Sequence, residues 1–390
     1  MKDDMKLTNH RRKSVVRGLK SENHLIWANY NCCITNVACS VLAHFGLPHK
    51  HSTLPLLDSY LQKKDYKNIV LLLYDGLGSA ILKQNLPANS FLRRHVKGEI
   101  CSVFPATTAA ATTSILSGLN PCEHGRVGYH VYIKALDEVV TIFENVIKDT
   151  EQEAAEYEVM TELLPYDGVA DQINRLPNVK AHILFPFGEN AYIDREDMRR
   201  RIVDLCAADG KKYIYAYSTE PDHTMHKCGT CGAEVTPLVE EINTLTEHLA
   251  ANLQDTLLIV LADHGHYETE VIYMEKECPQ LCKLLTRNTA IEGRACAFWV
   301  AKENQQAFKE EFERLYGNDF ILLDKAEVIR RQIFGDGAPC KNFADSIGDF
   351  LAVAVGNKYF ERYTHPDSMR SYHAGLNADE VLVPLIIIEK

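Results

Sequence analysis

Three aspartates and three histidines stand in short motifs whose side chains could bind metal ions. The motifs are YDG, EPDHTMH, ADHG and a late HAG, and they contain Asp75, Asp222, His226, Asp263, His264 and His373. Carboxylate oxygens and imidazole nitrogens together suit Zn²⁺, with Mn²⁺ or iron as alternatives. Six such side chains are more than one tetrahedral ion can use. We therefore expect two divalent ions, an arrangement that can stabilise both the attacking and the leaving oxygen in phosphoryl transfer.

Each motif on its own has a simpler interpretation. Asp75, which precedes Gly76, could be a turn residue after a strand. The adjacent Asp263 and His264 could form a pair at the start of a helix. It is the combination of the motifs that favours a metal site.

A threonine-rich segment, FPATTAAATTSILSGLNPCEHG at residues 104–125, contains the candidate nucleophile. Its pattern indicates the end of a strand followed by an alanine-rich helix. A hydroxyl at a helix N-terminus faces the positive end of the helix dipole and free N–H groups, and an adjacent metal would make it a stronger nucleophile. The simpler interpretation is that Thr107 caps the helix and Thr108 lies in its first turn.

Short apolar runs alternate with helical patterns along the chain, which is typical of βαβ units. The runs that predict strands cover residues 68–75, 180–186, 213–218, 256–263, 295–301, 319–323, 349–355 and 381–388. Because these runs are continuously apolar, we expect strands that are buried on both faces of a sheet. The predicted fold class is α/β, with a mainly parallel central sheet flanked by helices. Ligands of such sheets bind beyond the carboxyl ends of the strands, where the candidate ligands stand.

The order of the motifs resembles that of the alkaline phosphatase superfamily. The motifs are D-G, F-P-x-T-T, G-L-x-P-x-x-H-G, E-P-D-x-x-x-H, A-D-H-G and H-x-G, and they extend over residues 68–385. Within the superfamily, the resemblance is to the type I phosphodiesterase/nucleotide pyrophosphatase family. It implies an alkaline phosphatase-like fold and a hydrolase of phosphoric esters that acts on a small phosphorylated substrate.

The resemblance also assigns roles to individual residues. It implies that Thr108 is the nucleophile and forms a phospho-threonine intermediate, which water then hydrolyses. One metal would be held by Asp75, Asp263 and His264 and would also contact Thr108. The other metal would be held by Asp222, His226 and His373.

We expect the chain to be divided into three parts. Residues 1–66 would form an N-terminal helical extension packed on the core. Residues 67–266 and 373–390 would form the metal-binding core. Residues 267–372 would form an inserted α+β cap subdomain, which would set the choice of substrate, since the metals act only on the phosphoryl group.

Two further kinds of function stay open. In many members of the family that this chain resembles, an Asn three residues beyond the nucleophile helps to hold the phosphoryl oxygen. This chain has Ala111 there, which cannot donate a hydrogen bond, so backbone amides, Arg126 or Lys227 would have to do so. A phosphomonoesterase, phosphonate hydrolase or phosphomutase on the same scaffold is therefore one alternative. The other is a non-catalytic, metal-stabilised binding module, although the presence of every ligand and of the threonine argues against it.

Several residues near the motifs have ambiguous roles. His223 and His266 stand beside candidate ligands, and we expect them to support those ligands or to be exposed. The aromatic residues Tyr129, Tyr192 and Tyr267 could stack on a nucleobase, but ordinary packing explains each of them equally well.

The composition limits the partners and the location. The 390 residues include 42 Lys and Arg against 53 Asp and Glu, a formal net charge of −11. A protein that coats nucleic acid is excluded, because neutralising phosphates requires a surplus of basic residues. Residues 1–20 are polar and basic, and no apolar run reaches the roughly 20 residues of a membrane span. We therefore expect a cytoplasmic protein that has no membrane partner and keeps its twelve cysteines reduced.

Overall fold

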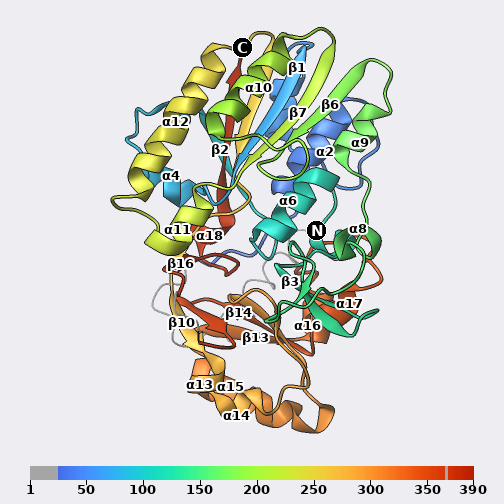
Figure 1. Ribbon diagram of the computed structural model, residues 1–390, viewed down its shortest axis with the longest axis vertical. Helices are drawn as coiled ribbons and strands as arrows, with labels where there is room; N and C mark the ends of the chain where they lie inside the picture. Colours follow the sequence, from blue (N-terminus) through green and yellow to red (C-terminus); the bar gives the residue numbers. More distant parts are fainter. Residues whose placement is uncertain (1–24, 365–367) are drawn as a thin grey trace, which may run out of the picture.

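Two large β-sheets form the upper and lower halves of the molecule in Figure 1. The computed structural model describes residues 25–364 and 368–390. The expectation for residues 1–20, on which the predicted location depends, lies outside the described residues.

The upper half is built on a six-stranded sheet of mainly parallel strands. In spatial order the strands are β2 (Val96–Cys101), β17 (Leu382–Glu389), β8 (Thr256–Leu261), β1 (Asn68–Tyr74), β7 (Lys211–Ser218) and β6 (Val179–Leu184). The four strands β8, β1, β7 and β6 are parallel, whereas β17 runs antiparallel to both β8 and β2. Every residue of β1 and β8 is buried. The predicted α/β fold with a mainly parallel central sheet is confirmed.

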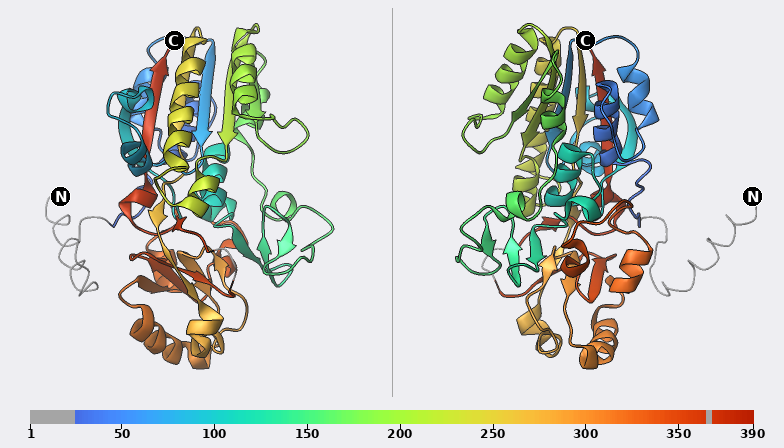
Figure 2. Two further views of the ribbon diagram at one scale, coloured as in Figure 1. Left: turned by 60° about the vertical axis from the view of Figure 1, so that its left-hand side comes forward. Right: turned by 90° about the vertical axis from the view of Figure 1, so that its right-hand side faces the viewer.

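Helices cover both faces of this sheet. The helices α10 (Arg195–Ala207) and α12 (Val235–Ala251) lie on one face, and α2 (Ile34–His44) lies on the other (Figure 2). In α12 the buried residues include Val239, Ile242 and Leu249, a spacing that places them on one side of a helix. On the other face α2 packs against α6 (Thr108–Ser117) and α9 (Val169–Asn174).

The lower half contains a seven-stranded sheet that is antiparallel throughout. Its strands in spatial order are β13 (Phe320–Asp324), β14 (Phe350–Ala354), β12 (Ala295–Phe298), β11 (Ala290–Ile291), β3 (His130–Ile133), β4 (Glu138–Thr141) and β5 (Val146–Ile147). Three of the predicted strands, in residues 295–301, 319–323 and 349–355, belong to this sheet rather than to the parallel one. Leu351 and Val353 of β14 face one apolar cluster, and its Phe350 and Ala352 face another, which includes α15 (Gln305–Tyr316). These antiparallel strands are buried on both faces, so their sequences are continuously apolar like those of parallel strands.

The second sheet is drawn from two separate stretches of the chain. Strands β3 to β5 lie within residues 67–266, the range expected for the metal-binding core, and the remaining strands lie within residues 267–372. The expected cap range therefore covers only part of this sheet. The smaller pairs are β10 (Glu270–Tyr273) with β15 (Lys358–Glu361), and β9 (Tyr267–Glu268) with β16 (Ser371–Tyr372).

The remaining helices of the described residues are short. They are α3 (Pro55–Leu61), α4 (Ser79–Asn85), α5 (Phe91–His95), α7 (Pro121–His124), α8 (Val159–Glu162), α11 (Asp222–Cys228), α13 (Met274–Glu277), α14 (Pro279–Cys282), α16 (Lys325–Arg330), α17 (Phe343–Ser346), α18 (Ala378–Val381) and the 3₁₀ helix η2 (Lys302–Asn304). Within the described ranges, no helix combines the length and the apolar character needed to cross a membrane. All twelve cysteines are free thiols.

A fully buried ion pair connects the two halves. Arg294, which precedes β12, forms a bidentate pair with Glu380 of α18, with Nε–Oε1 and Nη2–Oε2 distances of 2.7 Å. The Arg294 guanidinium also donates to the carbonyl oxygens of Lys358 and Gly356. Both charged side chains are 0% exposed, so removal of either one would leave the charge of the other buried and uncompensated.

Candidate metal and nucleophile site

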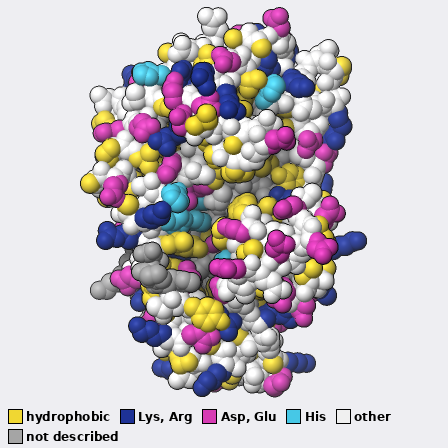
Figure 3. All heavy atoms as spheres, viewed as in Figure 1, with side chains coloured by type: hydrophobic (Ala, Val, Ile, Leu, Met, Phe, Trp, Pro, Cys, Tyr) yellow, Lys and Arg dark blue, Asp and Glu magenta, His cyan; other side chains and the backbone are white. Residues whose placement is uncertain are grey.

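The predicted ligands gather at one edge of the central sheet, at the level where the two halves meet. Strands β8, β1 and β7 are adjacent and parallel, so their carboxyl ends share this edge. Asp75 directly follows β1, Asp263 follows β8, and Asp222 opens α11 just after β7. In the space-filling view, histidine side chains gather at the surface between the two halves (Figure 3). Topology therefore brings together three motifs that are far apart in the sequence.

A tight turn presses Asp75 against Asp222. Gly76 has a φ of +72°, and a Cβ atom at this position would lie 3.0 Å from the Cβ atom of Asp222. The Asp222 amide donates to the Asp75 carbonyl at 3.1 Å, and the Gly76 amide donates to Asp263 Oδ1 at 3.1 Å. A side chain at position 76 would force these loops apart, which explains why glycine follows Asp75.

Thr108 is the first residue of α6. It points toward the first group of predicted ligands, which consists of Asp75, Asp263 and His264. Its Oγ1 lies 3.2 Å from His264 Nε2 and 3.3 and 3.4 Å from the two carboxylate oxygens of Asp75. His264 Nε2 in turn lies 3.2 Å from Asp75 Oδ1 and 3.7 Å from Asp263 Oδ2. The structure thus places the candidate nucleophile within reach of the ligands that the resemblance assigned to its metal.

The neighbouring Thr107 has a different environment. Its hydroxyl donates to Glu292 Oε1 at 2.6 Å. Glu292 also accepts from the Tyr129 amide at 2.9 Å and from the Tyr372 hydroxyl at 3.0 Å. Burial raises the pKa of Glu292, and the hydrogen bonds from Thr107, Tyr129 and Tyr372 oppose that shift. The Thr107 hydroxyl is therefore occupied by its hydrogen bond to Glu292, whereas the Thr108 hydroxyl faces the candidate metal ligands.

The second group of ligands surrounds Asp222 Oδ1. The Nε2 atoms of His226 and His373 lie 3.4 and 3.9 Å from this oxygen. His226 stands four residues after Asp222 in α11, so both side chains share one face of the helix. A third imidazole, that of His266, lies closer still, with its Nε2 at 2.6 Å. The ligand atoms of these four residues all lie within 4.8 Å of one another.

The hydrogen bonds of the three predicted histidines fit metal binding. In each ring Nδ1 is paired with a backbone carbonyl oxygen: that of Ser371 for His226 at 2.9 Å, Gly265 for His264 at 3.0 Å, and Ala106 for His373 at 3.1 Å. Only a protonated nitrogen can donate to a carbonyl oxygen, so Nδ1 carries the hydrogen. When Nε2 is deprotonated, as metal binding requires, its lone pair is directed into the cluster, which is the usual orientation of a metal-binding histidine.

The carboxylates also fit a bound cation. Asp263 Oδ2 is buried and has no hydrogen-bond partner. Burial and the negative charge of Asp75 hold the pKa of Asp263 well above its usual range. Burial lowers the pKa of His264, but the charges of Asp263 and Asp75 outweigh it and raise this pKa to about 10. A divalent cation would relieve the repulsion between the carboxylates and supply the missing partner of Oδ2.

The side chains considered as hydrogen-bond donors to a phosphoryl oxygen do not face the site or have other partners. Ala111 is fully buried in the core, so its side chain does not face the site. The Arg126 guanidinium donates to the Met160 and Leu164 carbonyl oxygens at 2.9 and 3.2 Å. The Lys227 ammonium is bonded to His223 Nε2 at 3.0 Å.

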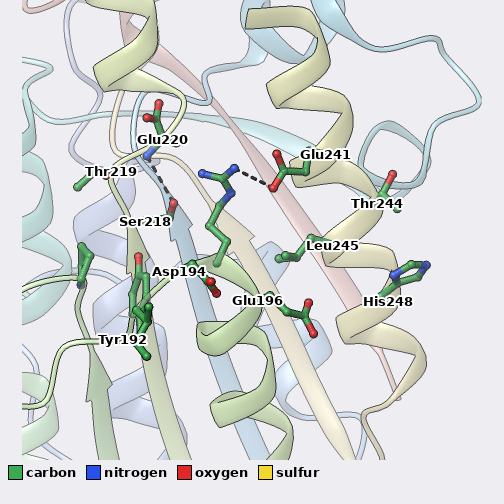
Figure 4. Close-up of a pocket in the computed structure, with 13 residues that line it drawn as sticks. Tyr192, Asp194, Glu196, Ser218, Thr219, Glu220, Glu241, Thr244, Leu245 and His248 are labelled. Atoms are coloured by element: carbon green, nitrogen blue, oxygen red, sulfur yellow. Dashed lines mark hydrogen bonds and ion pairs between the residues drawn. The ribbon is translucent and has the colours of Figure 1, made fainter. Parts of the chain in front are cut away.

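A cavity of about 660 Å³ lies between α10 and α12, and Figure 4 shows Tyr192, Ser218 and Glu241 in its lining. None of the seven candidate site residues lines it. Tyr192 is 6% exposed and donates its hydroxyl to the Tyr217 carbonyl at 2.8 Å. Tyr192 is therefore a packing residue and is not free to stack on a nucleobase.

Three residues of the site were not predicted as such. Tyr217, the penultimate residue of β7, donates its hydroxyl to Asp75 Oδ2. Glu292 holds Thr107, and His266 joins the second group. The sequence carries a signal only for His266, which stands two residues after His264 in ADHGH. Tyr217 and Glu292 reach the site through contacts between distant segments.

Comparisons with known structures agree with this geometry. Human ectonucleotide pyrophosphatase/phosphodiesterase 5 superposes with a TM-score of 0.63 at 13% identity, covering 82% of this chain and 87% of that one. The murine protein gives a TM-score of 0.61 at 17% identity, covering 81% and 87%. Phosphonoacetate hydrolase from Sinorhizobium meliloti 1021, in complex with phosphonoformate, gives 0.61 at 17% identity, covering 82% and 89%. At these identities the matches establish a shared fold.

The sequence itself matches a protein family over most of its length. No curated protein gives a significant match to this chain. The family described as type I phosphodiesterase / nucleotide pyrophosphatase matches residues 69–377, which include all seven candidate site residues. The chain therefore belongs to the type I phosphodiesterase/nucleotide pyrophosphatase family of phosphoric ester hydrolases.

Proposed function

We propose that this chain hydrolyses small phosphoric esters with Thr108 as its nucleophile and two divalent ions, Zn²⁺ in preference to Mn²⁺ or iron, as cofactors. The observation that carries the proposal is the position of Thr108 Oγ1. It lies at the N-terminus of α6, 3.2 Å from His264 Nε2 and 3.3 Å from Asp75 Oδ2. A threonine that served only to cap the helix would not need these partners.

Two sets of side chains would hold the ions. Asp75, Asp263, His264 and the Thr108 hydroxyl form the first set, and Asp222, His226 and His373 form the second. When bound, the ions would stabilise negative charge on the phosphoryl oxygens and favour ionisation of the attacking hydroxyl.

The chain's own groups account for the remaining chemistry. The Thr108 hydroxyl donates to Asp75, so this carboxylate is positioned to take its proton as Oγ1 bonds to phosphorus. The ester bond to the leaving alcohol breaks, and the phosphoryl group is carried on Thr108 until water cleaves the new bond. The first N–H groups of α6 lack partners within the helix and can bind the phosphoryl oxygens. This role for the backbone fits the absence of a side-chain donor at Ala111.

Replacement of the nucleophile tests the proposal. Thr108→Ala should lower turnover roughly 10³-fold or more, because the group that forms the covalent intermediate is gone. Metal content, measured by elemental analysis, should stay at two ions per chain. Thr107→Val serves as the matched control, since it removes the adjacent hydroxyl and should leave measurable turnover. Full activity in Thr108→Ala would refute the assignment and leave Thr107 as the candidate.

The type of ester is the main alternative within this proposal. The fold shared with phosphonoacetate hydrolase supports a phosphonate hydrolase as the second candidate. Turnover of p-nitrophenyl phosphate and of bis(p-nitrophenyl) phosphate would separate monoesterase from diesterase, and release of phosphate from phosphonoacetate would identify a phosphonate hydrolase. We expect the diester to be turned over fastest. No turnover of any of the three by the metal-loaded protein would favour the non-catalytic binding module.

A further inference from the structure

His266 lies inside the second group of ligands although the motifs assign it no role there. Its side chain is buried, and its Nε2 lies 2.6 Å from Asp222 Oδ1, closer than the Nε2 of either His226 or His373. The centre of its ring is 4.8 Å from that of His226 and 5.3 Å from that of His373. Three imidazoles thus converge on one carboxylate.

The contacts of Ser371 define which nitrogen of His266 carries a hydrogen. The Ser371 hydroxyl donates to the Met225 carbonyl oxygen at 2.7 Å, which uses its single proton. Ser371 Oγ also lies 3.0 Å from His266 Nδ1. The Oγ atom can only accept in this second contact, so the hydrogen is on Nδ1.

A neutral His266 with this hydrogen placement directs the lone pair of Nε2 at Asp222. At 2.6 Å this lone pair and the carboxylate oxygen repel unless a cation, either a proton on Nε2 or a metal ion, lies between them or beside them. The three predicted ligand histidines show the same arrangement, with Nδ1 held by an oxygen and Nε2 facing the cluster. His266 therefore shares the orientation of a ligand as well as the position of one.

We propose that His266 is a fourth protein ligand of the second metal site. This inference rests on the proposed function, because it presupposes that the cluster binds a metal. The second site then offers three imidazole nitrogens and one carboxylate oxygen, whereas the first offers two carboxylates, one imidazole and a hydroxyl. Nitrogen-rich sets favour Zn²⁺ over Mn²⁺ more strongly than oxygen-rich sets do. The second site is accordingly the one that selects Zn²⁺.

A metal competition experiment on the full chain tests the proposal. The wild type, His266→Gln and His223→Gln are loaded with Zn²⁺ and titrated with a chromogenic chelator. His223 is the matched control, because it is exposed and bonded to Lys227. In His266→Gln, the affinity for one of two ions should fall roughly 100-fold or more, beyond what loss of a supporting contact causes. In His223→Gln both affinities should be unchanged.

Two further readouts separate a ligand from a supporting residue. The visible spectrum of the Co²⁺-loaded protein should change in His266→Gln, since the ligand field of one ion loses a nitrogen. After dialysis against equal Zn²⁺ and Mn²⁺, the wild type should retain more Zn²⁺ than the variant. An unchanged Co²⁺ spectrum together with a fall in affinity of less than about 100-fold would overturn the proposal and show that His266 only orients Asp222.

The experiment also distinguishes failure of this inference from failure of the proposed function. A wild type that binds no Zn²⁺ contradicts both. A wild type that binds two ions, with His266→Gln indistinguishable from it, contradicts only the role of His266. Thermal unfolding of the metal-free variants checks that they fold, and His266→Asn replaces His266→Gln if the latter does not.

Discussion

Thr107 and Thr108 are adjacent in the chain, yet their hydroxyls have different partners. Thr107 is held by the buried Glu292, whereas Thr108 lies among Asp75 and His264. The difference arises because α6 begins at Thr108, which turns consecutive side chains in different directions. A nucleophile needs a hydroxyl beside groups that can activate it, and of these two threonines only Thr108 has its hydroxyl beside the candidate metal ligands.

At the residue scale, the buried His124 links stability to pH. Its Nδ1 accepts from the Arg126 amide at 3.1 Å, so its Nε2 carries the hydrogen and donates to Ser114 Oγ at 3.1 Å. Burial, and then the charge of Arg126, lower the pKa of His124 from 6.5 to about 3. Between these values the unfolded chain binds a proton that the folded chain does not, so stability falls as the pH falls.

We predict that His124→Gln makes the pH dependence of stability shallower between pH 6.5 and pH 3. The slope for this group is at most about 1.4 kcal/mol per pH unit, because one proton is involved. Urea unfolding of both proteins at several pH values, with equal metal content, measures the difference in slope. Equal slopes would show that His124 does not remain neutral in the folded protein.

The seven candidate site residues could be named from the sequence, but their immediate surroundings could not. Each of the seven stands in a short motif that can be recognised locally. Tyr217 and Glu292 contact the site through pairs that are 142 and 185 residues apart in the chain. Such contacts depend on how strands and loops meet, which no local pattern encodes.

At the scale of elements, the parallel sheet was predicted more completely than the antiparallel one. Strand β1 was predicted to within one residue, because its apolar run is long and unbroken. The direction of β12 and β14 was not predictable, since both faces of each strand are buried. Strands β4 and β5 have only 4 and 2 residues, too few to carry a recognisable period.

The contact between Arg294 and α18 gives a prediction at this scale. Arg294→Met should lower the free energy of unfolding by about 3–5 kcal/mol, because it leaves the buried Glu380 carboxylate without its charged partner. Arg314→Met is the matched control: it breaks the exposed pair with Glu311 within α15 and should leave the free energy of unfolding unchanged. Chemical denaturation of both variants provides the measurement. Equal stabilities would mean that the buried pair does not hold the halves together.

At the scale of the whole molecule, the two halves meet where the ligands lie. The net charge of −11 suggests at first a poor environment for a phosphate. However, three of the acidic residues, Asp75, Asp222 and Asp263, lie together at the sheet edge and are suited to bind cations. Two divalent ions would bring four positive charges to this point and convert an acidic edge into a site for anions.

The most direct test of the account is hydrolysis by the metal-free protein as Zn²⁺ is returned to it. The ions are removed with a chelator, and turnover of the best of the three test substrates is followed during a Zn²⁺ titration. We predict no turnover without metal and full recovery at two Zn²⁺ per chain. Undiminished turnover by the metal-free protein would contradict the account.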